Sequence, residues 1–125
     1  MKISFKRIDH IQICVPRTKE AEARAFYIGV LGLKEIEKPA YLVENGGFWL
    51  EIADIQLHIG VEDQVCESKR HPAFEIDDLE AAKAYLSGLN IRIKEDKPIP
   101  NFRRFSFFDP FNNRIELLER TDAYF

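Results

Sequence analysis

One pattern of residues occurs twice in this chain, and the repeat restricts the fold more than any other feature. A shift of 61 positions carries His10 onto His71, and a shift of 58 positions carries His58 onto Glu116. The shift of 58 also aligns residues 29–33 with 87–91 and residues 48–50 with 106–108. Self-similarity at a fixed spacing marks a repeated structural unit. We therefore expect one fold to occur twice, with a three-residue insertion or deletion between the two alignments.

Each copy is predicted to form a strand, a helix and three further strands, in that order. Alternation of apolar and polar residues identifies the strands, and segments rich in Pro, Gly and Asn separate them. In the first copy we expect strands at 8–15, 33–37, 47–52 and 55–61, and a helix with Thr18 as its N-cap that ends at Gly29. In the second copy we expect strands at 71–76, 91–94, 102–108 and 114–119, and a helix capped by Asp77 or Asp78 that ends at Gly88. Asn112 or Asn113, in the last turn, is predicted to take a left-handed backbone conformation.

Length and charge narrow the class of protein. A chain of 125 residues, 46% hydrophobic and 31% charged, fits one globular domain with its own core. Within that domain, residues 1–125, we expect the first module at about 5–62 and the second at about 69–120. The net charge of −3 comes from interspersed acidic and basic residues. Neither nucleic acid nor a membrane is therefore expected as a partner.

Cysteine usage indicates a reducing compartment. Cys14 and Cys66 are not spaced as a CxxC motif, and the sequence contains no recognisable signal peptide or long apolar span. We expect a cytoplasmic protein.

Strand periodicity predicts where the polar candidates point. Residues two apart in a strand lie on the same face of the sheet. On this basis His10, His58, His71 and Glu116 all lie on faces that the helices leave uncovered. A sheet that curls around a cavity would direct all four side chains into it.

Three segments together resemble the vicinal oxygen chelate superfamily, which includes glyoxalase I, fosfomycin-resistance thiol transferases, extradiol dioxygenases, methylmalonyl-CoA epimerase and bleomycin-resistance proteins. They are Asp9-His10-Ile11, the run 71–80, and Arg104 with the run Asp109-Pro110-Phe111-Asn112-Asn113-Arg114-Ile115-Glu116. The resemblance covers nearly the whole chain, and the last run is its most specific part. It implies an α+β fold of two βαβββ modules, related by pseudo-twofold symmetry, that form a curled mixed sheet around a cleft.

The resemblance also implies a metal site. In that family the first and last strands of the modules hold a divalent metal, and the matching residues here are His10, His58, His71 and Glu116. Members with three protein ligands would keep His10, His71 and Glu116. Imidazole and carboxylate donors suit Zn, Ni, Mn, Fe or Co, with positions left open for two neighbouring substrate oxygens. The metal would act as a Lewis acid that stabilises a developing oxyanion.

Further residues are candidates for proton transfer and substrate binding. Glu116 and His58 are the candidate catalytic residues, and Glu75 is a third group of suitable type for proton transfer. Arg103 and Arg104 are suited to hold a substrate carboxylate or phosphate. The full set of candidate substrate-binding residues is Arg103, Arg104, Gln12, Glu75 and Trp49.

Two classes of function remain open at this point. The first is a metal-dependent enzyme with lyase, isomerase, thiol transferase or dioxygenase chemistry on a small oxygenated metabolite or xenobiotic. Glyoxalase I itself differs, because it has a carboxylate where this chain has His58. The second class is a metal-free protein that sequesters a ligand, as bleomycin-resistance proteins do. By analogy we expect a homodimer, to which the aromatic residues Tyr124 and Phe125 are candidate contacts.

Overall fold

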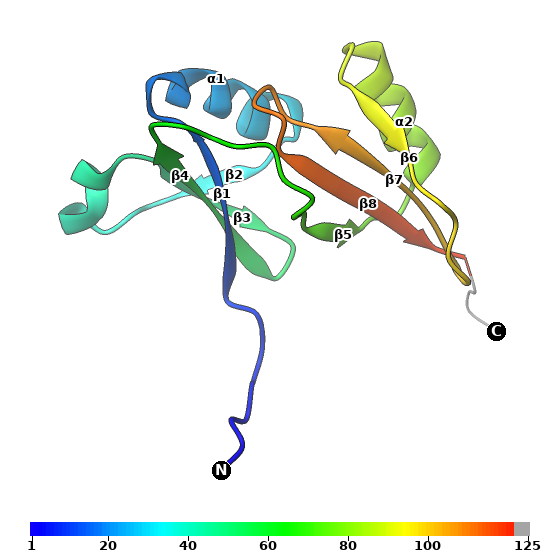
Figure 1. The fold of residues 1–125 in the computed structure, drawn as a ribbon, viewed down its shortest axis with the longest axis horizontal. Coiled ribbons are helices and arrows are strands. Elements are labelled where there is room, and N and C mark those ends of the chain that lie inside the picture. Colours follow the sequence, from blue (N-terminus) through cyan, green and yellow to red (C-terminus); the bar gives the residue numbers. More distant parts are fainter. Residues whose placement is uncertain (122–125) are drawn as a thin grey trace. The chain divides into compact units, whose positions relative to one another are not determined.

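Both halves of the chain form a four-stranded mixed sheet with a helix (Figure 1), as described by a computed structural model for residues 1–121. The chain divides into two units, Met1–Val65 and Cys66–Phe125, and each is described by itself. Tyr124 and Phe125 lie outside the described residues. None of the helices within residues 1–121 combines the length and the apolar character that crossing a membrane requires.

The first unit has the strand order β1-β4-β3-β2. Its strands are β1 (His10–Pro16), β2 (Lys34–Ile36), β3 (Phe48–Ile52) and β4 (Ile55–Glu62). The helical segment between β1 and β2 consists of a 3-10 turn (Arg17–Lys19), α1 (Glu20–Arg24) and a π-helical stretch (Ala25–Val30), and a 3-10 helix (Ala40–Asn45) precedes β3. Strand β1 is parallel to β4, and the other pairs are antiparallel. This is a βαβββ module.

The second unit has the equivalent order β5-β8-β7-β6. Its elements are β5 (Ala73–Glu75), α2 (Leu79–Gly88), β6 (Ile93–Glu95), β7 (Phe102–Phe108) and β8 (Arg114–Arg120). Strand β5 is parallel to β8, as β1 is to β4. The prediction of an α+β fold with two βαβββ modules is therefore confirmed. The common cleft and the pseudo-twofold relation stay predictions.

The cores of the two units contain apolar strand residues, and Val15 and Leu57 are on the side that periodicity assigned to the helix. In the first unit Val15, Leu57 and Leu50 are fully buried, and in the second Phe105 and Phe107 are almost fully buried. Each fully buried aliphatic or aromatic side chain contributes on the order of 1.5–3 kcal/mol to stability. The opposite face of each sheet is therefore left for polar side chains.

The pairing of residues across the strands shows which positions of the two copies are equivalent. Gln12 pairs with His58 across β1 and β4, and Ala73 pairs with Glu116 across β5 and β8. His10 and His71, each two residues earlier, are thus equivalent, as the shift of 61 predicts. The alignment of 48–50 with 106–108 is wrong by one residue. Trp49 pairs with His58 and Ser106 pairs with Glu116, so Trp49 corresponds to Ser106.

The two helices begin differently. Asp78 is the N-cap of α2, where its carboxylate accepts a hydrogen bond from the Ala81 amide at 3.0 Å, as predicted. The prediction of Thr18 as N-cap is wrong, because Thr18 lies inside the 3-10 turn and no side chain caps either helical segment there. Pro16, the last residue of β1, is the N-cap residue of that turn and has an extended backbone. Asn112 has φ 69°, as expected for the left-handed position.

Candidate functional site

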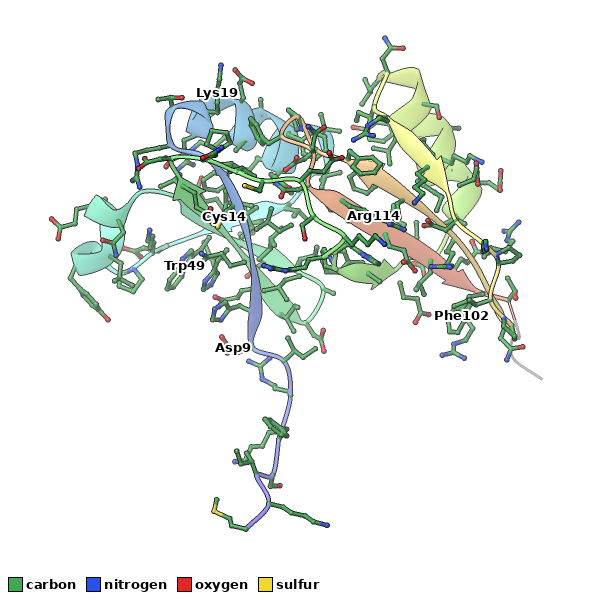
Figure 2. All side chains as sticks on the ribbon, viewed as in Figure 1. Asp9, Cys14, Lys19, Trp49, Phe102 and Arg114 are labelled. Atoms are coloured by element: carbon green, nitrogen blue, oxygen red, sulfur yellow. The ribbon has the colours of Figure 1, made fainter. Side chains whose placement is uncertain are left out.

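The first unit holds two histidine rings in contact on the face opposite its core. His10 and His58 stack with their ring centroids 4.0 Å apart and 16° between their planes. Trp49 stacks on His58, also at 4.0 Å and with an interplanar angle of 1°. His58 is only 6% exposed. We call His10 and His58 the first half-site (Figure 2, where the neighbouring Asp9 and Trp49 are labelled).

Hydrogen bonds orient both rings of the first half-site. Asp9 Oδ2 lies 2.9 Å from His10 Nδ1, and because an ionised carboxylate only accepts, Nδ1 carries the proton. His58 Nε2 lies 2.9 Å from Gln56 Oε1. A carboxylate behind a histidine is the arrangement that fixes the tautomer of metal-binding imidazoles. His10 Nε2 and His58 Nδ1 are then the ring atoms left to bind a ligand.

The charges around the first half-site favour a neutral His58. Burial lowers the pKa of His58, and repulsion from His10 adds to this effect. The hydrogen bond from His10 lowers the pKa of Asp9, and attraction to Arg7 contributes in the same direction. A neutral imidazole has a lone pair available, which a metal ligand and a general base both require.

The second unit brings His71 and Glu116 together. His71 Nε2 lies 3.1 Å from Glu116 Oε1, and Glu116 is 5% exposed. His71 Nδ1 lies 2.9 Å from the carbonyl oxygen of Lys69, which fixes Nδ1 as the donor. Arg104 Nη1 donates to the same Glu116 oxygen at 3.2 Å. We call His71 and Glu116 the second half-site.

The donor set of the second half-site fits a cation. Nδ1 of His71 donates to a carbonyl, so Nε2 is the atom that faces the carboxylate of Glu116. Either Nε2 and the carboxylate share a proton, or Nε2 presents a lone pair and a cation lies between the two groups. Two ligands that each lie roughly 2.0–2.2 Å from one ion are about 3.3–3.6 Å apart at the tetrahedral angle and about 2.8–3.1 Å apart at the 90° angle of octahedral coordination. The observed separation of 3.1 Å matches the octahedral spacing.

A buried polar network supports the second half-site. Ser106, which pairs with Glu116, donates from Oγ to Asp96 Oδ2 at 2.7 Å. Arg114 donates to Ser106 Oγ at 3.0 Å and to Asp96 Oδ1 at 2.7 Å. The Asp96 side chain is 4% exposed. Satisfied buried networks of this kind hold neighbouring side chains in one arrangement.

The candidate substrate-binding residues are not all near the half-sites. Trp49 and Arg104 contact His58 and Glu116, as described above. Gln12 lies on the His10 face, where its amide is 3.8 Å from Cys14 Sγ, and burial raises the pKa of that thiol. Glu75 is exposed on β5, where periodicity places it on the His71 face.

Arg103 lies apart from the second half-site. Its guanidinium pairs with Glu119 at 2.9 Å, and Glu119 also accepts from the Leu79 amide at 2.9 Å. These contacts tie β7 and β8 to the start of α2. Hydrogen bonding from the Leu79 amide and from Arg103 lowers the pKa of Glu119. These contacts place the Arg103 guanidinium at the start of α2, and its role in substrate binding stays a prediction.

Sequence reasoning missed the residues that orient the ligands. Asp9 was noted only within a motif, although a carboxylate next to a candidate metal-binding histidine is a usable signal. The Lys69 carbonyl carries no sequence signal, because any residue offers that oxygen. Asp96 lies outside every predicted strand, and only the fold reveals its contact with Ser106.

Neither unit alone, within residues 1–121, groups three or more His, Cys, Asp or Glu side chains as a metal ion would require.

Similar proteins place the chain in a family. A family model described as the Glyoxalase/Bleomycin resistance protein/Dioxygenase superfamily matches residues 7–117. The uncharacterised Escherichia coli protein YaeR is 30% identical, with 94% of this chain and 99% of YaeR covered. A crystal structure of a glyoxalase family protein from Bacillus anthracis is 40% identical with a TM-score of 0.88, and covers 96% of this chain and 99% of its own. The fosfomycin resistance protein FosX from Listeria monocytogenes, at 21% identity and a TM-score of 0.76 over 95% of this chain and 97% of its own, shares the fold. The chain belongs to the Glyoxalase/Bleomycin resistance protein/Dioxygenase superfamily.

Proposed function

We propose that this protein is a metal-dependent enzyme that acts on a small oxygenated metabolite or xenobiotic. One divalent ion would be held by His10, His71 and Glu116, with His58 as a fourth ligand or as the group that transfers a proton. The observation that supports this most is the convergence of His71 Nε2 and the buried Glu116 carboxylate at 3.1 Å. Two atoms suited to bind a metal ion meet there, and Arg104 is the cationic side chain that pairs with the carboxylate.

Each residue has a defined task in this proposal. Asp9 and the Lys69 carbonyl hold the two histidines in the tautomer that leaves Nε2 available. When bound, a divalent ion supplies Lewis acidity toward a substrate that chelates through two neighbouring oxygens. His58, neutral because of its burial, accepts a proton at Nδ1. Trp49 excludes water from one side of that ring by stacking on it.

The first half-site adds neutral imidazoles to the single carboxylate of the second. A set of histidines with one carboxylate fits Zn, Ni, Mn, Fe or Co better than Mg or Ca, which prefer oxygen ligands. The ligands come from one chain or from two copies of it, and mixing a His10→Ala variant with a Glu116→Gln variant distinguishes these cases. Complementary half-sites in a homodimer would restore metal binding in the mixture, whereas ligands within one chain would not.

Cobalt substitution tests the proposal without a known substrate. Metal-free protein titrated with Co²⁺ is expected to develop visible d–d absorption that saturates near one equivalent. Acetohydroxamate, which chelates through two neighbouring oxygens, is expected to shift those bands by entering the open positions. Failure to bind Co²⁺, together with failure to bind Zn²⁺, Ni²⁺, Mn²⁺ or Fe²⁺, would overturn the proposal and favour a metal-free ligand-sequestering protein. Unchanged bands with acetohydroxamate would argue against bidentate chelation.

The proposal also includes a cellular location and partners for the enzyme. Cys14 and Cys66 are both free cysteines, and we propose a cytoplasmic location on the sequence argument alone. The proposed partner is a small-molecule substrate, in a homodimer, with no nucleic acid or membrane involved.

A further inference from the structure

The second unit contains a basic pocket beside the second half-site. It has a volume of about 450 Å³ and is lined by Glu67, Ser68, Lys69, Arg92, Lys94, Phe108 and Arg114. That volume lies within the usual range for small-molecule sites, roughly 300–1,000 Å³. We call these seven residues the basic pocket. Arg114, at the start of β8, is labelled in Figure 2.

The basic pocket opens on the same face of the sheet as Glu116. Lys94 pairs with Ser106, and Ser106 pairs with Glu116, so these three side chains form one row across the sheet. Phe108 pairs with Arg114 two positions along the same strands. Lys69 also links the two features, because its carbonyl orients His71 and the same residue lines the pocket. A molecule bound in the pocket is therefore next to the second half-site.

The charges of the basic pocket are only partly compensated. The carboxylate of Asp96 neutralises Arg114 at 2.7 Å. Four basic side chains against the carboxylates of Glu67 and Asp96 leave an excess of two positive charges. Within residues 1–121 the ammonium groups of Lys69 and Lys94 make no ion pair or hydrogen bond. Two unpaired ammonium groups in one pocket attract an anion.

The arginines of the basic pocket are held in place. The Arg92 guanidinium stacks 3.7 Å from the centroid of the Phe108 ring and donates to Asn112 Oδ1 at 3.3 Å. Arg114 is fixed by Asp96 and by Ser106. Preorganised guanidinium groups lose little conformational entropy on binding an oxyanion. The pocket thus combines two guanidinium groups held by other side chains with two unpaired ammonium groups.

From this arrangement we infer that the basic pocket binds a doubly charged tetrahedral oxyanion, a phosphate or phosphonate group. As the anionic part of the enzyme's substrate, this group would place neighbouring oxygens of the same molecule at the second half-site. The assignment of this group to the enzyme's substrate rests on the proposed function, whereas the binding of the anion itself does not. A dianion is favoured over a carboxylate because two uncompensated positive charges remain in the pocket.

Titration calorimetry on chelator-treated, metal-free protein tests the inference. The probes are inorganic phosphate, methylphosphonate and acetate at low ionic strength and pH 8. Phosphate and methylphosphonate are expected to bind saturably, and acetate on the order of tenfold more weakly. Lys69→Met and Lys94→Met are each expected to weaken phosphate binding on the order of tenfold. Lys34→Met, which removes one positive charge from β2 outside the pocket, is the matched control and is expected to leave the affinity for phosphate unchanged.

Several outcomes would overturn the inference. They are an absence of saturable phosphate binding, acetate binding as tight as phosphate, or an equal loss in the Lys34→Met control. Amide chemical shifts provide a second readout that does not depend on the variants. Phosphate is expected to perturb the amides of Lys69, Lys94 and Phe108, and perturbations confined to other residues would contradict the inference. Because no metal is present, this result is independent of whether the proposed metal centre exists.

Discussion

The two half-sites occupy equivalent positions in two copies of one fold, yet they are built from different interactions. In the first, His58 lies between the rings of Trp49 and His10, with both centroids 4.0 Å away. In the second, the equivalent position holds Glu116, which is surrounded by His71 and Arg104. Stacking positions the first pair and charge positions the second. The repeat conserves where these polar side chains lie, and the local sequence decides their chemistry.

This contrast follows from a single cross-strand position. Trp49 opposite His58 gives an aromatic surface, whereas Ser106 opposite Glu116 leaves room for Asp96 and Arg114. A buried carboxylate needs charged or hydrogen-bonding partners, and the second unit supplies them. A buried neutral imidazole needs only one hydrogen bond and flat neighbours, which the first unit supplies. The difference predicts that the second half-site contributes most of the metal affinity.

The largest expected effect comes from removing the only carboxylate of the four proposed ligands. Glu116→Gln keeps the size of the side chain but removes its charge, so metal affinity should fall by more than the roughly 10- to 100-fold typical of an orienting residue. Metal content after equilibrium dialysis measures this loss. Glu75→Gln, on exposed β5 of the same unit, is the control and should retain the metal. If Glu116→Gln retained full metal content, the second half-site would not be the dominant one.

A smaller loss is expected when the carboxylate behind His10 is changed. Asp9→Asn should weaken metal binding about 10- to 100-fold, because His10 loses the acceptor that fixes its tautomer. Competition with a chromogenic chelator measures the affinity, and ¹⁵N chemical shifts of the His10 ring report the tautomer. Asp54→Asn, in the turn between β3 and β4, removes the same charge without touching His10. Equal effects of the two substitutions would show that only net charge matters.

The helix starts of the two units offer a stability test. Asp78→Ala should lower the free energy of unfolding by about 1 kcal/mol, because α2 loses its N-cap. Thr18→Ala should change it by less than about 0.5 kcal/mol, since Thr18 caps nothing. Urea denaturation followed by circular dichroism measures both. A larger loss for Thr18→Ala would contradict the difference between the two helix starts.

The smallest effect concerns acid sensitivity. The pKa of Glu119 is lowered in the folded state by the Leu79 amide and by Arg103. Its stabilising effect is therefore present above the pKa of an unfolded glutamate, about 4.3, and is lost as pH falls through the lower pKa of the folded state. Wild type should lose more stability than Glu119→Gln between pH 6 and pH 3. Parallel losses in thermal melts over that range would rule out this contribution.

Much of the fold could be predicted because it is encoded locally. Alternation identified every strand, and strand β7 was predicted without error at its ends. His71 was expected inside a strand, but β5 begins at Ala73, which leaves the His71 ring free to reach both Lys69 and Glu116. The one-residue error at Trp49 arose because hydrophobic similarity cannot fix register where aromatic residues are consecutive. Hydrogen-bonded pairing decides it.

The candidate site was harder to predict than the fold. Side-chain periodicity was enough to place His10 with His58 and His71 with Glu116. The contacts of Asp96 with Ser106 and Arg114 depend on a loop and on hydrogen bonds between residues far apart in the sequence, which periodicity does not describe. No sequence pattern indicates the place of Lys69 in the basic pocket, because that place depends on Lys94 of β6 and Arg114 of β8, which line the same pocket.

The central claim is that both half-sites bind one and the same ion, and metal stoichiometry tests it most directly. Protein reconstituted with Zn²⁺ or Ni²⁺, and measured by mass spectrometry of the metal, should contain about one ion per chain. His10→Ala and His71→Ala should each lose it, although they change different units. A single variant that retains the full complement of metal would contradict the claim, as would a wild type that binds no divalent metal.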